Sequence, residues 1–216
     1  MLTESRHDRP IIFSGEMVRE IQAGRKTQTR RIVKPQPPSD NGTGRWTFCV
    51  DSTERKHRDT WTFREVCPDG DTHTERGRER ELWRGRCPYG MPGDQLWVKE
   101  NFRLRLDEDH CPPADSWSAK IGSAPWYEAD GPWSPSGCAG GAGKLRPSIF
   151  MPRWASRLTL EITFVRIERL QEITESGARA EGVSCRAEFV RLWDTINGKR
   201  APWASNPWLW VVGFRK

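Results

Sequence analysis

The sequence AGRKTQTRR, residues 23–31, places one lysine, three arginines and two threonines in nine residues without an acidic side chain. An apolar stripe over residues 17–21 precedes it and predicts a short helix that Ser14 can cap. Gly24 then suits the position just past a helix end, where a positive φ is favourable. Residues 31–34 can run extended up to the next proline, so we expect a basic loop between the end of a helix and a strand.

Lys26 is the residue of this stretch with a candidate catalytic role. Three neighbouring arginines repel its charge, and burial would add a desolvation cost, so both effects would lower its pKa. A lysine with a lowered pKa can act as a base or a nucleophile. The alternative is a solvated basic turn, which is the usual place for a run of like charges.

The pattern Gly24-x-Lys26-x-x-Thr29-x-Arg31 resembles the G-x-K-x-x-E/T-x-R signature of the ASCH family, a branch of the PUA-like barrels. Two later blocks continue the resemblance in the same order. Residues 92–98 are similar to the family's glycine-aspartate turn leading into a barrel strand.

The second block, residues 158–183, resembles the family's next strand and short helix and ends on Glu181-Gly182. The whole resemblance is to prophage-encoded ASCH proteins and covers roughly residues 10–38 and 87–216. It implies an α+β fold: a PUA-like (ASCH) mixed β-barrel with flanking helices and a β-hairpin insertion. Closure into a barrel would remove exposed sheet edges. The competing interpretation is an open α+β sheet.

ASCH relatives include small amidohydrolases that remove the acyl group from N4-acetylcytidine with a lysine, a threonine and a glutamate. The resemblance therefore implies that Lys26, Thr29 and Glu181 are catalytic. Lys26 could take a proton from Thr29 or from a water, and Glu181 could pass one to the leaving amine. For Glu181 the alternative is an exposed helical glutamate. The residues expected to bind the substrate are Gly24, Thr27, Arg30 and Arg31, of which Arg31 could stabilise the oxyanion or hold a phosphate. No metal and no cofactor are expected.

Other proteins of the same fold bind or cleave RNA, so two alternative functions remain. One is a non-catalytic nucleic-acid-binding module in which Lys26, Arg30 and Arg31 hold phosphate and tryptophans stack on bases. The other is a ribonuclease. A net charge of +6 favours a polyanionic partner. The expected partners are thus a nucleoside or RNA substrate with phosphate contacts, and the oligomeric state is left open.

The length of 216 residues suits one domain. We expect a disordered lead over residues 1–9 and a single domain over 10–216, with insertions at about 39–86 and 104–147. The latter segment is rich in Gly, Pro and Ser and predicts a mobile loop, within which Trp126 and Tyr127 could close over a site.

Residues 45–86 of the first insertion contain a short internal repeat. The run Trp-Thr-Phe at 46–48 recurs at 61–63, which predicts a β-hairpin. A third run at 81–84 could add to it. The tryptophans of this insertion either stack on nucleobases or pack on the barrel.

The C-terminal half has the clearest periodicity. Alternation over 158–164 predicts a strand, and a shift of the apolar phase predicts a bulge near Phe164. Residues 174–182 predict a capped helix that ends at a glycine. Residues 189–196 give a second amphipathic helix, and 208–214 a buried closing strand.

The sequence also indicates a compartment. Residues 1–10 are polar and charged and do not resemble a signal peptide, and no apolar run approaches the roughly 20 residues that cross a bilayer. We therefore expect a cytoplasmic protein without a membrane partner. The six cysteines form no C-x-x-C pair, which predicts free thiols, although Cys67, His73 and Cys87 could contribute to a zinc site.

Overall fold

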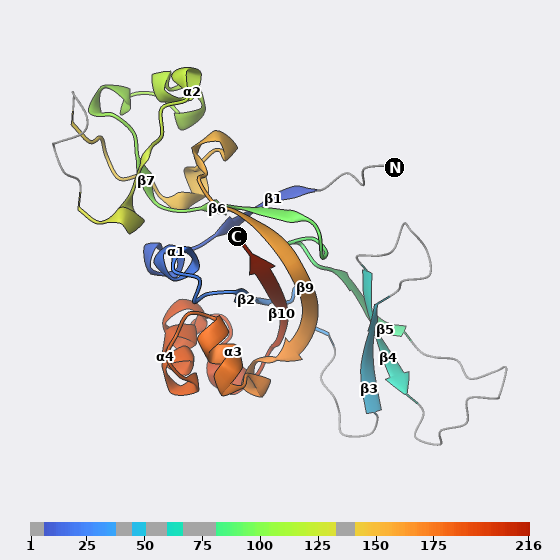
Figure 1. Ribbon diagram of the computed structural model, residues 1–216. Coiled ribbons are helices and arrows are strands. Elements are labelled where there is room, and N and C mark those ends of the chain that lie inside the picture. The colour runs from blue at the N-terminus through green and yellow to red at the C-terminus, as the bar shows by residue number, and fades with distance from the viewer. Residues whose placement is uncertain (1–6, 38–44, 51–59, 67–80, 133–140) are drawn as a thin grey trace.

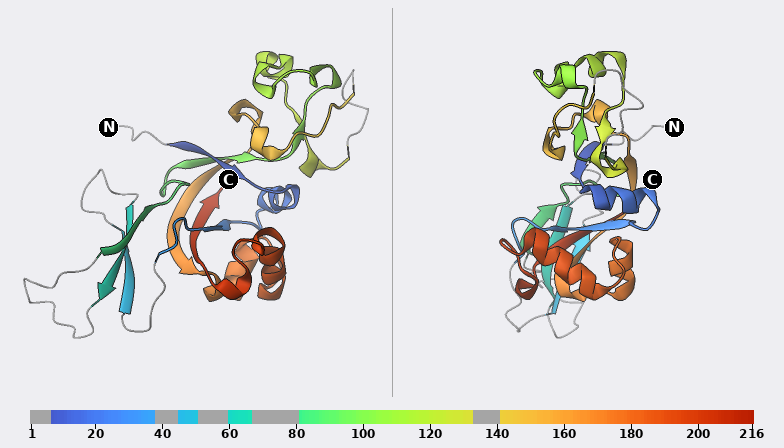
Figure 2. Two further views of the ribbon diagram at one scale, coloured as in Figure 1. Left: turned by 180° about the vertical axis from the view of Figure 1, so that it is seen from behind. Right: turned by 90° about the vertical axis from the view of Figure 1, so that its left-hand side faces the viewer.

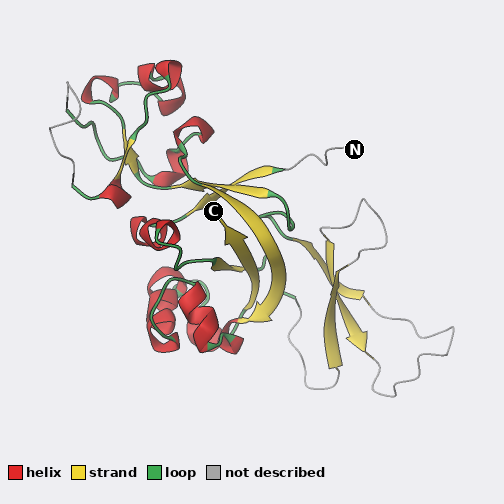
Figure 3. Cartoon of the chain, in the orientation of Figure 1, coloured by secondary structure: helices red, strands yellow, loops and turns green. Residues whose placement is uncertain are grey.

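The computed structural model describes residues 7–37, 45–50, 60–66, 81–132 and 141–216. Figure 1 shows a curved sheet at the centre of the molecule, with α1, α3 and α4 on one side. The small sheet β3–β5 lies on the other side, and the segment with α2 extends from one end. Figure 3 shows that strands make up the centre and the small sheet, whereas helices lie at the periphery.

The central sheet has five strands in the order β1-β6-β9-β10-β2. β1 pairs with β6 in parallel, and the other pairs are antiparallel. Its strands are β1 (Asp8–Ile12), β6 (Gln95–Lys99), β9 (Thr159–Arg169), β10 (Trp208–Arg215) and β2 (Gln28–Ile32).

The predicted α+β class with a mixed sheet is confirmed, but the predicted barrel closure is wrong. β1 and β2 are the two edges of the sheet and do not pair with each other. A side chain connects them: Arg31 Nη2 donates to the carbonyl of Ile12 at 2.6 Å. The competing interpretation, an open sheet, describes this feature correctly.

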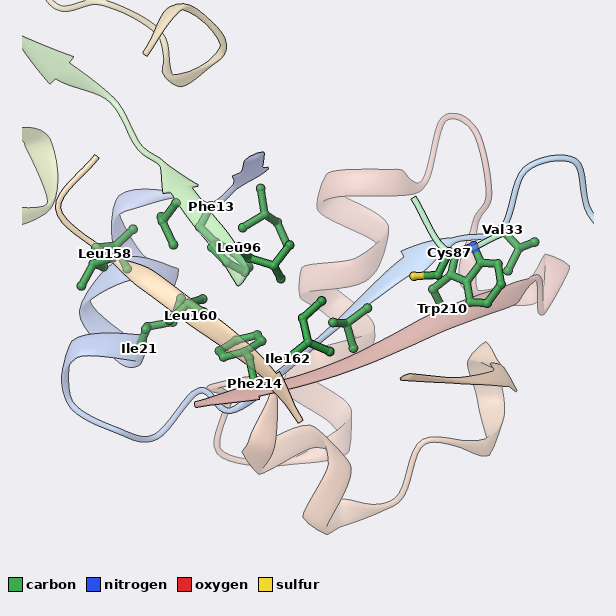
Figure 4. Close-up of a cluster of buried hydrophobic side chains, with 14 of the residues drawn as sticks. Phe13, Ile21, Val33, Cys87, Leu96, Leu158, Leu160, Ile162, Trp210 and Phe214 are labelled. Carbon is green, nitrogen blue, oxygen red and sulfur yellow. The ribbon is translucent and has the colours of Figure 1, made fainter. Parts of the chain in front are cut away.

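Successive residues of β10 contact different cores, because side chains alternate across a strand. Trp210, Val212 and Phe214 belong to the main cluster, which also contains Phe13 and Leu96 (Figure 4). Leu209 instead belongs to a second cluster, formed with Leu170, Ile173, Ala178, Phe189 and Trp193. A fully buried strand therefore separates two apolar layers, as the continuous apolar run at 208–214 predicts.

The helices begin and end where the sequence predicts. α1 (Gly15–Gln22) is capped by Ser14, whose Oγ accepts from the N–H of Met17 at 3.3 Å. Gly24 follows it with a φ of 74°. α3 (Glu175–Ala180) is capped by Thr174, and α4 spans Arg186–Asn197. The basic stretch is only partly a loop, because residues 28–31 already belong to β2.

The first insertion forms an antiparallel sheet of β3 (Arg45–Val50), β4 (Thr60–Val66) and β5 (Glu81–Arg86), so the predicted hairpin and its third strand are confirmed. Trp61 and Trp83 are 7% and 8% exposed and belong to the main core. Their rings lie 5.8 and 6.3 Å from the ring of Trp210. These two indoles therefore pack on the sheet, which leaves them unable to stack on bases. The rest of the insertion's tip lies outside the described residues.

The second insertion is more regular than predicted. β7 (Phe102–Arg103) pairs with β8 (Trp126–Tyr127), and α2 spans Trp117–Ile121. A third apolar cluster contains Phe102, Tyr127 and Met151. Tyr127 is buried and donates to the carbonyl of Ala155 at 2.9 Å, so it does not close over a site. Residues 133–140, with part of the glycine run, lie outside the described residues.

Short 3₁₀ helices connect the larger elements. They span Leu106–Glu108, Pro113–Asp115, Glu128–Asp130, Ser148–Phe150, Arg153–Ala155, Leu170–Glu172 and Trp203–Ser205.

Two further predictions concern the ends of strands. β1 already begins at Asp8, so the disordered lead predicted over 1–9 extends too far by two residues; residues 1–6 are not described. The bulge predicted near Phe164 is confirmed, since Phe164 pairs with Gly213 whereas the next residue, Phe214, pairs with Ile162. Within the described part of the chain, no helix has the length and apolarity needed to span a bilayer.

Candidate active site

A buried ion pair joins Lys26 and Glu181, which are 155 residues apart in the sequence. Lys26 Nζ donates to Oε2 and to the backbone carbonyl of Glu181, both at 2.8 Å. The side chains are 1% and 6% exposed. The turn after α1 positions the lysine, and the C-terminal end of α3 positions the glutamate. The glutamate is thus not the exposed helical residue of the alternative interpretation.

Arg30 extends this pair into a four-membered network. Its Nη1 donates to Glu181 Oε1 at 3.2 Å, and its Nη2 donates to Glu168 Oε2 at 3.0 Å. The arginine side chain is only 2% exposed. The buried cations Lys26 and Arg30 therefore face Glu181 and Glu168, and the more exposed Arg166 also contacts Glu168. These contacts offset the large desolvation cost of burying either Lys26 or Arg30 alone.

The protonation of Lys26 is balanced by opposing effects. Burial lowers its pKa, the charge and hydrogen bond of Glu181 oppose this, and Arg31 and Arg30 lower it further, with a net decrease. Two N–H groups of the amine already have acceptors on Glu181. A neutral amine has only two N–H groups, so deprotonation would leave both bonds in place and free a lone pair. The site can therefore hold a neutral lysine without losing a hydrogen bond.

A cleft of about 820 Å³ opens beside this network. Its lining includes Glu181, residues 29–32 of β2, Met17 of α1, and Phe189 and Trp193 of α4. Figure 2 shows β2 passing between α1 and α4. The volume lies within the range of roughly 300–1,000 Å³ that is usual for small-molecule sites.

The cleft is strongly cationic. Among the described residues that line it, one side chain, Glu181, is a carboxylate. The cationic residues of the lining are Arg30, Arg31, Lys34, Arg86, Arg169 and Arg200. Such a wall attracts anionic ligands, phosphates in particular.

The predicted catalytic residues reach this cleft to different degrees. Thr29 and Glu181 line it, whereas Lys26 is not part of the described lining and lies behind Glu181. Thr29 is on β2 and 4% exposed, and in the part of the chain that the structure describes its hydroxyl makes no hydrogen bond to the other two. The expected loop position of Thr29 is wrong, because Thr29 belongs to β2 and pairs with Val212 of β10.

The predicted substrate-binding residues divide in the same way. Arg30 and Arg31 line the cleft, and the Arg31 guanidinium lies 5.4 Å from the ring centroid of Phe13. Gly24 and Thr27 are exposed and outside the described lining. The N–H of Thr27 donates to the carbonyl of Ala180 at 2.9 Å, so this residue supports the turn.

The sequence did not point to Glu168 or to the apolar walls of the cleft. Glu168 lies on β9, where it pairs with Leu209 of β10, and Arg30 lies on β2, on the other side of β10. The two side chains meet across β10. The sequence places Phe189 and Trp193 on one face of a helix, but it does not indicate which part of the chain packs against that face. No local pattern identifies a partner more than a hundred residues away.

In the ranges that the structure describes, no group of three or more His, Cys, Asp or Glu side chains is arranged to hold a metal ion. Cys111 and Cys185 are free thiols. Cys67 and His73, which the zinc alternative requires, lie outside the described residues.

Comparison of the chain with protein-family models, with curated proteins and with solved structures gives no match. The features of the chain that indicate a function are the geometry of this cleft and the sequence motif of β2 and the turn before it.

Proposed function

We propose that the protein is a hydrolase that removes the acyl group from an N4-acylated cytidine-type base, with Lys26, Thr29 and Glu181 as the reacting residues. The observation that supports this most directly is the 2.8 Å contact between Lys26 Nζ and Glu181 Oε2 at the wall of a cleft that Thr29 also lines. The hydrogen bond between the two groups gives a proton a direct path between the amine and the carboxylate, and burial lowers the pKa of Lys26.

In the proposed reaction the Thr29 hydroxyl attacks the acyl carbon and loses its proton to the Glu181–Lys26 pair. The same pair returns the proton to N4, which leaves as the amino group of cytidine. Water then attacks the acyl group on Thr29 and gives a proton to the Glu181–Lys26 pair. The pair returns this proton to the Thr29 oxygen, and the acyl group leaves as a carboxylic acid. Arg31 carries the charge that develops on the acyl oxygen, a role in which one donor contributes about 10²–10³ in rate.

The test is hydrolysis of N4-acetylcytidine, followed by chromatography of the cytidine released. We expect Thr29→Ala to lower kcat/KM by roughly 10²–10⁴, the range for loss of a reacting group, and Thr29→Ser to retain part of the activity. Thr27→Ala is the matched control, because Thr27 is exposed and outside the described lining. Wild-type turnover by a folded Thr29→Ala variant would refute the assignment.

A non-catalytic nucleic-acid-binding module is the second candidate, and the six cations of the cleft lining favour it. Such a module would bind RNA with an affinity that falls steeply with salt, by a slope set by the number of phosphates neutralised. If RNA binds in this way while N4-acetylcytidine and RNA are both recovered intact, the binding function replaces the hydrolase. Cleaved RNA would instead favour a ribonuclease.

A further inference from the structure

Strand β2 has an unpaired edge. It is the last strand of the central sheet, and within the described ranges it pairs with β10 alone. The N–H of Val33 donates to the carbonyl of Trp208, and the N–H of Phe214 donates to the carbonyl of Thr27, at 3.0 and 2.8 Å. In an antiparallel ladder these bonded pairs recur at every second residue. The odd-numbered residues of the strand therefore bond to β10.

The even-numbered residues of β2 must then direct their backbone groups away from β10. In the described part of the chain, neither the N–H nor the carbonyl of Arg30 or Ile32 has a hydrogen-bond partner. Arg30 is only 6% exposed, so its outward backbone groups face a confined space. Buried backbone groups are almost always paired, with protein, water or a ligand.

The confined space is the cleft itself. Its lining contains the consecutive residues 29, 30, 31 and 32. Side chains alternate between the two faces of a strand, so a cavity that touches all four must extend along the strand's edge. The carbonyl of Arg30 and the N–H of Ile32 consequently point into the cleft from neighbouring positions, an acceptor followed by a donor.

We propose that these two backbone groups read the base of the substrate, given the hydrolase function proposed above. A cytosine acylated on N4 keeps an N4–H donor next to the N3 acceptor. The carbonyl of Arg30 accepts from N4–H, and the N–H of Ile32 donates to N3. Uracil presents an acceptor and then a donor in the same places, so two like groups would face each other and the pairing would fail.

The direction of the strand supports this arrangement. β2 runs from Thr29 towards Lys34, and N4, N3 and the ribose follow one another along the edge of the base. With N4 at Arg30, the acyl group points towards Thr29 and Glu181, which line the cleft. The ribose then points towards Lys34, a cation suited to a phosphate on the sugar. One pose thus satisfies the backbone groups, the proposed chemistry and the charge of the wall.

The first experiment measures binding by the wild-type protein with calorimetry. The probes are cytidine, 3-deazacytidine, which lacks the N3 acceptor, and uridine. We expect cytidine to bind roughly three- to tenfold more tightly than 3-deazacytidine, the effect of one hydrogen bond, and uridine to bind more weakly still. Equal affinities for all three, or no binding of cytidine, would overturn the proposal.

The second experiment removes the donor. Ile32→Pro deletes an N–H that is not part of the ladder with β10, and proline is tolerated at such edge positions. Ile32→Val keeps the N–H and is the matched control. We expect Ile32→Pro to weaken cytidine roughly three- to tenfold and to leave the affinity for 3-deazacytidine unchanged. An equal loss for both ligands would show that the substitution acts only through the shape of the cleft.

These measurements are separate from turnover, because cytidine is the product and is not hydrolysed. If N4-acetylcytidine is recovered intact but cytidine and 3-deazacytidine are distinguished as expected, the hydrolase function fails and the reading of the base by β2 stands. If hydrolysis occurs without that discrimination, the reverse holds.

Discussion

Replacing Glu181 by glutamine tests the centre of the network most directly. The substitution keeps the size of the side chain and removes its charge. Of the carboxylates in this network Glu168 would then remain, and it contacts Arg30 and Arg166 but makes no ion pair with Lys26 among the described residues. The glutamine oxygen and the backbone carbonyl can still accept from Lys26, but the side chain of Lys26 is 1% exposed, so water screens its uncompensated charge poorly.

The expected loss of stability follows from that burial. Removing one member of a buried ion pair typically costs about 3–5 kcal/mol, because the other charge stays buried without compensation. Here the lysine can lower this cost by losing its proton. Glu181 is the group that opposes the decrease in the pKa of Lys26, so the variant should have a still lower lysine pKa. The destabilisation should therefore be largest at low pH and should diminish as the pH rises through the new pKa.

The sign is fixed by linkage. When the pKa of a lysine is lower in the folded than in the unfolded protein, the unfolded state binds more protons in the interval between the two values. Stability then rises with pH across that interval. Urea denaturation followed by tryptophan fluorescence, repeated between pH 6 and about 10, measures the effect.

Two control variants make the result specific. Glu16→Gln changes an exposed glutamate of α1 and should cost less than about 1 kcal/mol, with no comparable rise of stability with pH. Lys26→Met in the Glu181→Gln background removes the unpaired cation and should recover part of the loss. A Glu181→Gln variant that loses less than about 1 kcal/mol at pH 7 would refute the description of this pair as a coupled, buried network.

Three other predictions follow from contacts elsewhere in the protein. Arg157→Met should cost about 3–5 kcal/mol in urea denaturation, because it leaves Glu100, 1% exposed, without the guanidinium that contacts it at 2.9 and 3.0 Å; a wild-type midpoint would contradict this. Gly213→Ala should lower stability by about 1–3 kcal/mol, since an added Cβ would lie 2.1 Å from the ring of Phe164, and an unchanged melting temperature would show that the ring moves freely. Burial raises the pKa of Tyr127 to about 12, so the folded state keeps a proton that the unfolded state releases above pH 10, and stability should fall by about 2 kcal/mol between pH 10 and 12; the test is whether Tyr127→Phe removes that part of the slope.

Much of the fold could be predicted because its signals are local. Ser14 and Thr174 cap their helices through contacts three residues away, and alternation reveals β9. The repeated Trp-Thr-Phe run that begins at Trp61 in the first insertion also predicted a strand. The second insertion was misjudged as irregular, because Phe102, Tyr127 and Met151 form a core from short segments whose individual patterns are weak.

The candidate site was predictable only in part. The basic motif supplied Lys26, Thr29, Arg30 and Arg31 by position, and the similarity of a second block supplied Glu181. The loop that was expected to bring Lys26 and Thr29 together is instead the start of an edge strand. Pairing with β10 holds Thr29 at the wall of the cleft, whereas the side chain of Lys26 contacts Glu181.

Local patterns in the amino-acid sequence predict α1, α3 and α4, the bulge of β9 and the charge of the basic stretch. The acid that meets this charge, and the open sheet with β2 at its edge, become visible in the folded chain. Helix capping and strand alternation depend on residues a few positions apart, so a short stretch of sequence encodes them. An ion pair between residues 155 apart and an unpaired strand edge depend on how the whole chain packs, and no short stretch encodes them.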